Sequence, residues 1–255
     1  MTLKGDVCVD AVSTALKQGY RHLDTAERYG NESEVGEGLR ASGIDRNAVF
    51  VTTKVYHDKL APADFEKSFD ESLQKLKLAS VDLLLIHWPN PKVPLADTMR
   101  VLCKARRDGR AKHVGIANFT LPLIEEAVRL ATEPLVTNQI EVHPFLDQSK
   151  VIAASRRHGL SITAYCPLAR GKVPGAPTLT RIGKAHGKTA SQAALRYLVQ
   201  LGLVLIPRSS NTQRLTENLA LFDFSLSDAE MTEIANLRRT DGRVVNPPHA
   251  PKWDS

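Results

Sequence analysis

Short hydrophobic runs alternate with longer amphipathic runs along the whole chain. The run 81–86 is almost continuously aliphatic, which is typical of a strand buried on both faces of a parallel sheet. The longer runs carry the three-to-four-residue spacing of surface helices. The pattern predicts strands at 22–26, 49–55, 81–88, 113–119, 137–142, 161–167 and 204–209, and helices at 7–19, 32–42, 63–78, 96–109, 121–131, 147–159, 190–202 and 212–221.

Residues at the ends of the amphipathic runs support these helices. Glycine stands where several runs stop, at 19, 43, 109, 159 and 202, and glycine favours the left-handed conformation that ends many helices. Asn31 with Glu34 predicts an N-cap followed by a carboxylate in the first turn. Ser227 with Glu230 is the capping-box pattern, which predicts a further helix near the C-terminus.

The repeated strand-then-helix order predicts one parallel sheet covered by helices. The length suits a (β/α)8 TIM barrel, which typically takes about 250 residues. The pattern contains seven strands, because helix 7–19 opens the chain and no strand precedes it. We therefore expect a barrel without its N-terminal hairpin and first strand. One domain is predicted over 1–255, with a loop at 172–177 and the tail 241–255 packing on the barrel.

The composition narrows the class of protein. Hydrophobic residues make up 42% and charged residues 24%, which are values of a globular chain. The formal charge is +6, but the basic residues are dispersed, and the densest run, 104–112, fits the polar face and end of a helix. Nucleic-acid binding is therefore not expected. A solvated surface or an anionic small-molecule partner accounts for the charge.

Cysteines and apolar runs indicate the compartment. Cys8, Cys103 and Cys166 are far apart and form no Cys-x-x-Cys motif, so neither a zinc site nor a disulfide framework is expected. A sparse, odd count suits a reducing cytosol. The first residues hold no apolar signal region, and no run approaches the roughly 20 residues of a membrane helix. We expect a cytoplasmic monomer that does not bind membranes.

Each predicted strand ends in a polar residue, and the active sites of such barrels lie at the carboxyl ends of the strands. Asp24, Tyr29, Lys54 and His87 form a chemically coherent set among these residues. A lysine cation lowers the pKa of a nearby tyrosine, a carboxylate holds the lysine, and a histidine orients a carbonyl oxygen. The set suits reduction of an aldehyde or ketone, with tyrosine as proton donor and a nicotinamide as hydride source.

Taken singly, most of these residues have ordinary structural explanations. Asp24 could cap a turn, and His87 could be a hydrogen-bonded core histidine. Lys54 is the exception, because a lysine inside an apolar strand needs a partner. Together, at the ends of successive strands, they favour the catalytic interpretation.

The segment 20–32, Tyr-Arg-His-Leu-Asp-Thr-Ala-Glu-Arg-Tyr-Gly-Asn-Glu, resembles the signature of the aldo-keto reductases. The segments 53–55, 85–89, 115–119 and 206–209 agree with the same family. The likeness runs from about residue 7 to the C-terminus, and the endings 241–245 and 250–254 are most similar to bacterial 2,5-diketo-D-gluconate reductases.

The resemblance implies a role for each matched residue. Tyr29 is the general acid, Lys54 and Asp24 assist it, and His87 orients the substrate. NADPH is the implied cofactor, and a small carbonyl compound such as 2,5-diketo-D-gluconate or methylglyoxal is the implied substrate. The implied cofactor-binding residues are Asn118, Gln139, Tyr165, Leu168, Arg208, Ser209, Arg214, Glu217 and Asn218, and the implied substrate-binding residues are Trp88, Tyr56 and His57.

The chain departs from the family pattern at three places. Ala117 stands where the family usually has Ser, so one hydrogen bond to the nicotinamide carboxamide is lost. Arg208 replaces a phosphate-binding Lys and keeps its charge. The first strand, which contacts cofactor and substrate in the family, has no counterpart. The last departure keeps open a non-catalytic NADP(H)-binding or regulatory protein on the same scaffold.

Three other patterns receive structural explanations. Residues 36–41 match the dinucleotide fingerprint Gly-x-Gly-x-x-Ala but lie inside a predicted helix, so we reject that reading. Glu141 and His143 are too few ligands for a metal, which also weakens the alternative of a metal-dependent barrel hydrolase. Cys166 is expected to be a packed thiol.

Overall fold

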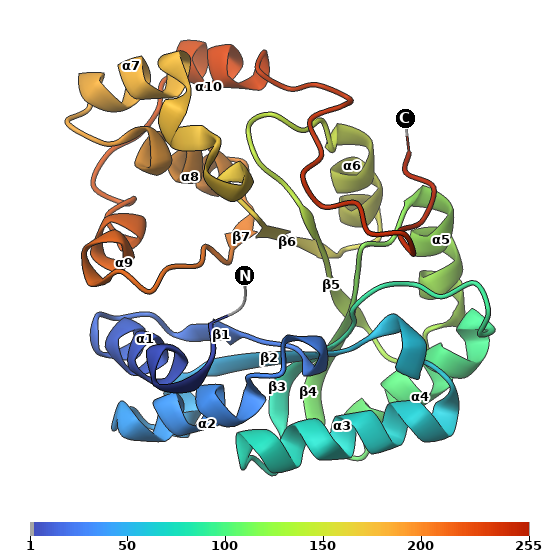
Figure 1. Ribbon diagram of the computed structural model, residues 1–255. Helices are drawn as coiled ribbons and strands as arrows, with labels where there is room; N and C mark the ends of the chain where they lie inside the picture. Colours follow the sequence, from blue (N-terminus) through green and yellow to red (C-terminus); the bar gives the residue numbers. More distant parts are fainter. Residues whose placement is uncertain (1–2, 255) are drawn as a thin grey trace.

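The computed structural model describes residues 3–254, and its centre is a curled sheet of parallel strands (Figure 1). The spatial order of the strands follows the chain, from β1 to β7. All seven predicted strands are present. Their bounds are β1 (His22–Asp24), β2 (Phe50–Val55), β3 (Val81–Ile86), β4 (Ala111–Ala117), β5 (Leu135–Glu141), β6 (Ser161–Tyr165) and β7 (Val204–Leu205).

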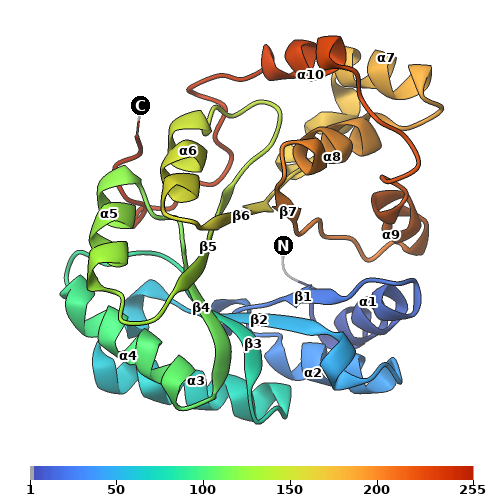
Figure 2. The same cartoon turned by 180° about the vertical axis from the view of Figure 1, so that it is seen from behind.

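The sheet is an open barrel of the (β/α)8 type. Within the described chain, β1 pairs only with β2 and β7 only with β6, so the curl does not close. In both views, β1 and β7 lie at the two edges of this opening (Figures 1 and 2). The expectation of a barrel architecture with seven strands is confirmed.

Helices cover the outside of the sheet. The helices α1 (Gly5–Lys17), α2 (Glu32–Ala41), α3 (Pro62–Leu76), α4 (Leu95–Arg107), α5 (Leu121–Leu130), α6 (Ser149–Arg157), α8 (Ala190–Gln200) and α9 (Thr212–Leu219) match predicted runs, and α10 (Asp228–Ala235) follows the predicted capping box. Both bonds of that box, between Ser227 and Glu230, are present. The five glycines predicted to end helices all have positive φ.

Two local predictions were wrong. Segment 172–177 is not a plain loop, because it contains a 3-10 turn (Val173–Gly175) and leads into a helix that was not predicted, α7 (Pro177–Ala185). This helix is short and buries only Leu179, Ile182 and Gly183, so it offers few apolar positions to a sequence pattern. Asn31 occupies the N-cap position of α2 without capping it. Its side chain instead accepts from Thr25 Oγ1 at 2.8 Å and donates to Leu3 O at 3.1 Å.

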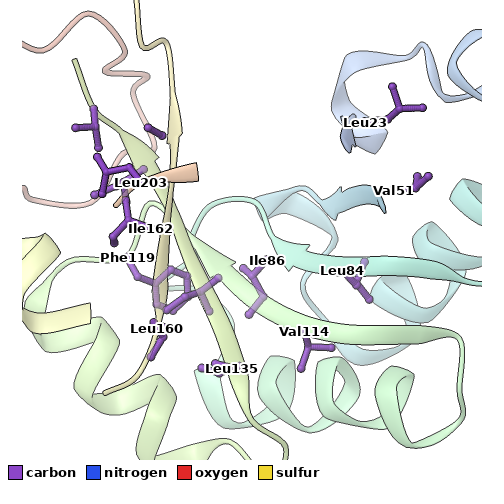
Figure 3. Close-up of a cluster of buried hydrophobic side chains, with 14 of the residues drawn as sticks. Leu23, Val51, Leu84, Ile86, Val114, Phe119, Leu135, Leu160, Ile162 and Leu203 are labelled. Atoms are coloured by element: carbon purple, nitrogen blue, oxygen red, sulfur yellow. The ribbon is translucent and has the colours of Figure 1, made fainter. Parts of the chain in front are cut away.

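The core lies between the sheet and the helical layer. Val51, Leu84 and Val114 come from three neighbouring strands and belong to one buried cluster (Figure 3). The two glycines of the rejected fingerprint serve packing: a Cβ at Gly36 would lie 2.3 Å from Leu76 O, and one at Gly38 would lie 2.7 Å from Val9 O. They let α2 approach α3 and α1 closely.

Two hydrogen bonds join the residues that follow α1 to α9, where the sheet is open. Tyr20 Oη donates to Leu215 O at 2.9 Å, and Gln18 Nε2 donates to Thr212 O at 3.2 Å. Helix α9 thus contacts α1 and the residues that follow it, although β1 and β7 do not pair. No helix within residues 3–254 combines the length and the apolar character needed to cross a membrane.

Candidate active site

The carboxyl ends of β1, β2 and β3 bring the four predicted catalytic residues together. Asp24 ends β1, and Lys54 lies one residue before the end of the neighbouring strand β2. Tyr29 follows β1 in a 3-10 turn, η1 (Glu27–Tyr29), and His87 directly follows β3. Parallel strands in chain order place these ends side by side.

Lys54 is fully buried and is held by three oxygen atoms. Its Nζ forms an ion pair with Asp24 Oδ1, donates to Thr25 O at 2.9 Å and lies 3.5 Å from Tyr29 Oη. Burial opposes the charge, but the Asp24 carboxylate and the Tyr29 phenol outweigh it and raise the pKa of Lys54. The ammonium therefore stays charged against the phenol oxygen.

Lys54 acts on the pKa of Tyr29 in the predicted downward direction, but its effect does not set the net shift. Burial raises the pKa of the Tyr29 phenol, and the opposing effect of Lys54 is smaller. The phenol thus remains protonated at neutral pH. A protonated phenol is able to donate a proton, and a cation this close to the phenol oxygen favours a phenolate there.

His87 lies at the edge of the Tyr29 ring. The ring centroids are 5.5 Å apart with an interplanar angle of 83°. Burial, followed by the charge of Lys54, holds the pKa of His87 well below its ordinary value, so the imidazole is neutral. Its Nδ1 atom is buried and has no hydrogen-bond partner in residues 3–254. A neutral ring beside a phenol can donate one hydrogen bond to a carbonyl oxygen.

Three of the predicted cofactor-binding side chains are linked to this centre. Asn118, at φ 63°, donates through Nδ2 to His87 O at 2.9 Å and accepts from Tyr165 Oη at 2.7 Å. Gln139 Nε2 donates to Asp24 Oδ2 at 2.8 Å. The amide groups are thus oriented beside the tetrad by hydrogen bonds from neighbouring strands.

The remaining predicted cofactor residues form a second group at the other end of the sheet. Leu168 follows β6 and packs against the core. Arg208 and Arg214 are exposed, and neither has a carboxylate within 4.0 Å in the described part of the chain. They flank the start of α9, where Ser209 Oγ accepts from Asn211 N at 3.0 Å. Glu217 and Asn218 lie within the same helix.

The predicted substrate residues meet the C-terminal tail. His57 stacks on His249 with ring centroids 3.9 Å apart, and Tyr56 Oη lies 3.2 Å from His249 Nε2. Trp88 contacts both His249, at 5.3 Å, and Trp253, at 6.0 Å between centroids. Sequence reasoning missed His249, because nothing local distinguishes it within a proline-rich segment.

Glu141 anchors this tail. Its carboxylate is fully buried and accepts from Val244 N at 2.6 Å, from Val245 N at 2.9 Å and from the His143 ring at 3.0 Å. Arg243 lies 3.9 Å from the same carboxylate. The Glu141 and His143 pair, which we rejected as a metal site, therefore has a structural role, because it binds the backbone of the C-terminal tail.

Comparisons with known proteins agree with this geometry. The model of the aldo/keto reductase family matches residues 6–239. Methylglyoxal reductase DkgB of Yersinia pestis is 40% identical over 256 aligned positions, covering 99% of this chain and 96% of the relative. A crystal structure named for 2,5-diketo-D-gluconic acid reductase B superposes with a TM-score of 0.97 at 48% identity, covering 99% of this chain and 91% of the other.

A more distant structure was solved with a cofactor. The Bombyx mori aldo-keto reductase in complex with NADP has a TM-score of 0.88 at 34% identity, covering 95% of this chain and 86% of that one. The family model and the relatives both span nearly the whole chain and include the strand ends that carry the tetrad. The chain therefore belongs to the aldo/keto reductase family.

Proposed function

We propose that the protein is an NADPH-dependent reductase of small aldehydes and ketones with Tyr29 as the proton donor. The observation that carries the proposal is the contact of Lys54 Nζ with both Asp24 and Tyr29, beside a neutral His87. The arrangement places a protonated phenol, a fixed cation and a neutral imidazole around one point. Such a point suits a carbonyl oxygen that gains negative charge.

The nicotinamide cofactor would supply the hydride. In the proposed mechanism, His87 orients the carbonyl oxygen toward Tyr29, and Tyr29 gives that oxygen its proton. Lys54 stabilises the phenolate that forms, and Asp24 fixes Lys54 in place. Lys54 is fully buried and the Asp24 side chain is 7% exposed, so the cation is fixed before the reaction and little reorganisation is needed.

The donor sets on the other strands fit the cofactor. Asn118 and Gln139 present amides beside the tetrad, and the Tyr165 ring adjoins them and supports stacking on a nicotinamide. Arg208, Ser209 and Arg214 gather cationic and hydroxyl donors at the start of α9, which suits the 2′-phosphate of NADPH. Leu168 would line the pyrophosphate path, and Glu217 and Asn218 the adenine side.

The names of two relatives suggest substrates for this enzyme. One is named a methylglyoxal reductase and another a 2,5-diketo-D-gluconic acid reductase. We propose compounds of these two kinds as substrates, bound against Trp88, Tyr56 and His57. The Tyr56 ring adjoins His87, and His57 and Trp88 adjoin His249 of the C-terminal tail.

The test is NADPH oxidation with methylglyoxal and with 2,5-diketo-D-gluconate, measured for the wild type and for Tyr29→Phe. General acid catalysis contributes about 10²- to 10⁴-fold, so kcat of the variant falls by that factor. NADPH binding, followed by fluorescence, stays unchanged because the ring is kept. Near-normal turnover by Tyr29→Phe would refute the mechanism.

Cofactor binding without turnover by the folded wild type would favour the alternative of a non-catalytic NADP(H)-binding protein. Replacing NADPH by NADH, which lacks the 2′-phosphate, tests the proposed role of Arg208, Ser209 and Arg214. We expect Arg208→Gln and Arg214→Gln to weaken NADPH binding and to leave NADH binding unchanged.

A further inference from the structure

Five residues next to the Tyr29–His87 pair form what we call the mouth cluster: Arg28, Tyr56, His57, Trp88 and His249. They come from η1, from the segments after β2 and β3, and from the C-terminal tail. None of the roles proposed above involves Arg28 or His249.

The ring contacts lead outward from His87. The Tyr56 ring centroid lies 5.4 Å from that of His87 and 5.4 Å from that of His249. The Arg28 guanidinium carbon lies 5.2 Å from the Tyr56 centroid. Arg28 also directly precedes Tyr29 in η1, so the guanidinium and the proposed proton donor belong to the same turn.

The charge of the mouth cluster is positive. Arg28 is exposed, and no carboxylate within residues 3–254 lies within 4.0 Å of it. Arg28 acts on the pKa of His87 with the sign of a positive charge. Asp24, the acid nearest to the centre, is already paired with Lys54, and Asp58 is exposed on the following turn.

His249 does not contribute a positive charge to the mouth cluster at neutral pH. Burial, followed by His57 and Arg28, lowers the pKa of His249, so its ring is neutral at neutral pH. A neutral ring is compatible with the close stacking on His57. A guanidinium is permanently charged and presents paired donors that match a carboxylate.

We infer that Arg28 binds a carboxylate of the substrate, and that the enzyme prefers carbonyl compounds bearing a carboxylate over neutral ones of the same size. The inference rests on the proposed reductase function. A substrate whose carbonyl lies between Tyr29 and His87 can extend over Tyr56 toward Arg28, with His249 forming the adjacent wall.

The test compares two aldehydes of similar shape, 4-carboxybenzaldehyde and its neutral methyl ester. The wild type should favour the carboxylate. A charged hydrogen-bonded pair of this kind is worth about tenfold or more, so Arg28→Gln should lower kcat/KM for the carboxylate by about tenfold through KM. Turnover of the ester should change less than twofold. Added salt should raise KM for the carboxylate alone, because it screens an exposed charge.

Control variants separate charge from geometry. Arg28→Lys keeps the charge but loses the paired donors, so it should fall between Arg28→Gln and the wild type. Arg129→Gln removes an exposed charge from α5 and should behave as the wild type.

Equal losses for both aldehydes in Arg28→Gln, or no preference in the wild type, would overturn the inference while the reductase function stands. If the preference for glyceraldehyde 3-phosphate over glyceraldehyde exceeds the preference for 4-carboxybenzaldehyde over its ester, the assignment to a carboxylate is overturned. Failure to reduce either aldehyde, or any other carbonyl compound, would remove the proposed function and the inference together.

Discussion

Single buried charges hold the candidate active site together. Lys54 stands out in the sequence because a lysine within an apolar strand needs a partner, and the structure supplies Asp24, Thr25 and Tyr29. The sign of the resulting pKa shift at Tyr29 was not predictable, because it depends on how burial and the charge of Lys54 balance. That balance exists only once the surrounding residues have excluded water.

Glu141 gives a second prediction for a single residue. Glu141→Gln replaces one acceptor oxygen with a donor facing the backbone N–H of Val244 or Val245, so at least one buried donor loses its partner. We expect a loss of about 1–3 kcal/mol in unfolding free energy. We also expect faster proteolysis of the tail and a higher KM for carbonyl substrates, because the tail carries His249 to Tyr56.

The matched control is Glu37→Gln, an exposed change on α2 that should leave stability, proteolysis and KM unaltered. Wild-type resistance of the tail to protease in Glu141→Gln would contradict the anchoring role.

Contacts of α9 with α1 and with the residues that follow it link the two edges of the sheet where β1 and β7 do not pair. The Tyr20 hydrogen bond to Leu215 O is partly buried, and burial raises the pKa of Tyr20 to about 12. Tyr20→Phe should reduce the free energy of unfolding by about 1 kcal/mol, measured by urea denaturation with an unchanged m-value. Gln18→Ala removes an exposed bond from the end of α1 to α9 and should cost less. An equal or larger loss in Gln18→Ala would argue against this explanation.

The pattern-based predictions at the scale of elements succeeded where periodicity was strong. Long amphipathic runs such as 63–78 appear as helices within two residues of their expected ends. Helix α7 was missed because its apolar face is short, and Asn31 was misassigned because Thr25 and Leu3 take its side chain. Those partners are remote in sequence and come together only in the fold.

For the whole molecule, buried histidines predict sensitivity to acid. Burial lowers the pKa of His22, and it lowers that of His87 further, from the ordinary value of 6.5. Below pH 6.5 the unfolded chain binds more protons than the native chain. The free energy of unfolding therefore has its full value above pH 6.5 and falls as the pH drops through the native pKa values. The melting temperature should decrease between pH 7.5 and pH 5.5. His22→Gln should reduce this decrease, and a pH-independent melting temperature in the wild type would contradict the prediction.

The sequence by itself determined the parallel strand-and-helix architecture, the order of the strands and the family, because these depend on local periodicity and on motifs at set spacings. It also pointed to Asp24, Tyr29, Lys54 and His87, since residues at successive parallel strand ends must meet at one edge of the sheet. Only the tertiary structure decided the protonation of Tyr29, the anchoring of the tail on Glu141 and the meeting of Arg28, Tyr56 and His249. Each of these depends on desolvation or on contacts between segments far apart in the chain, which no local pattern encodes.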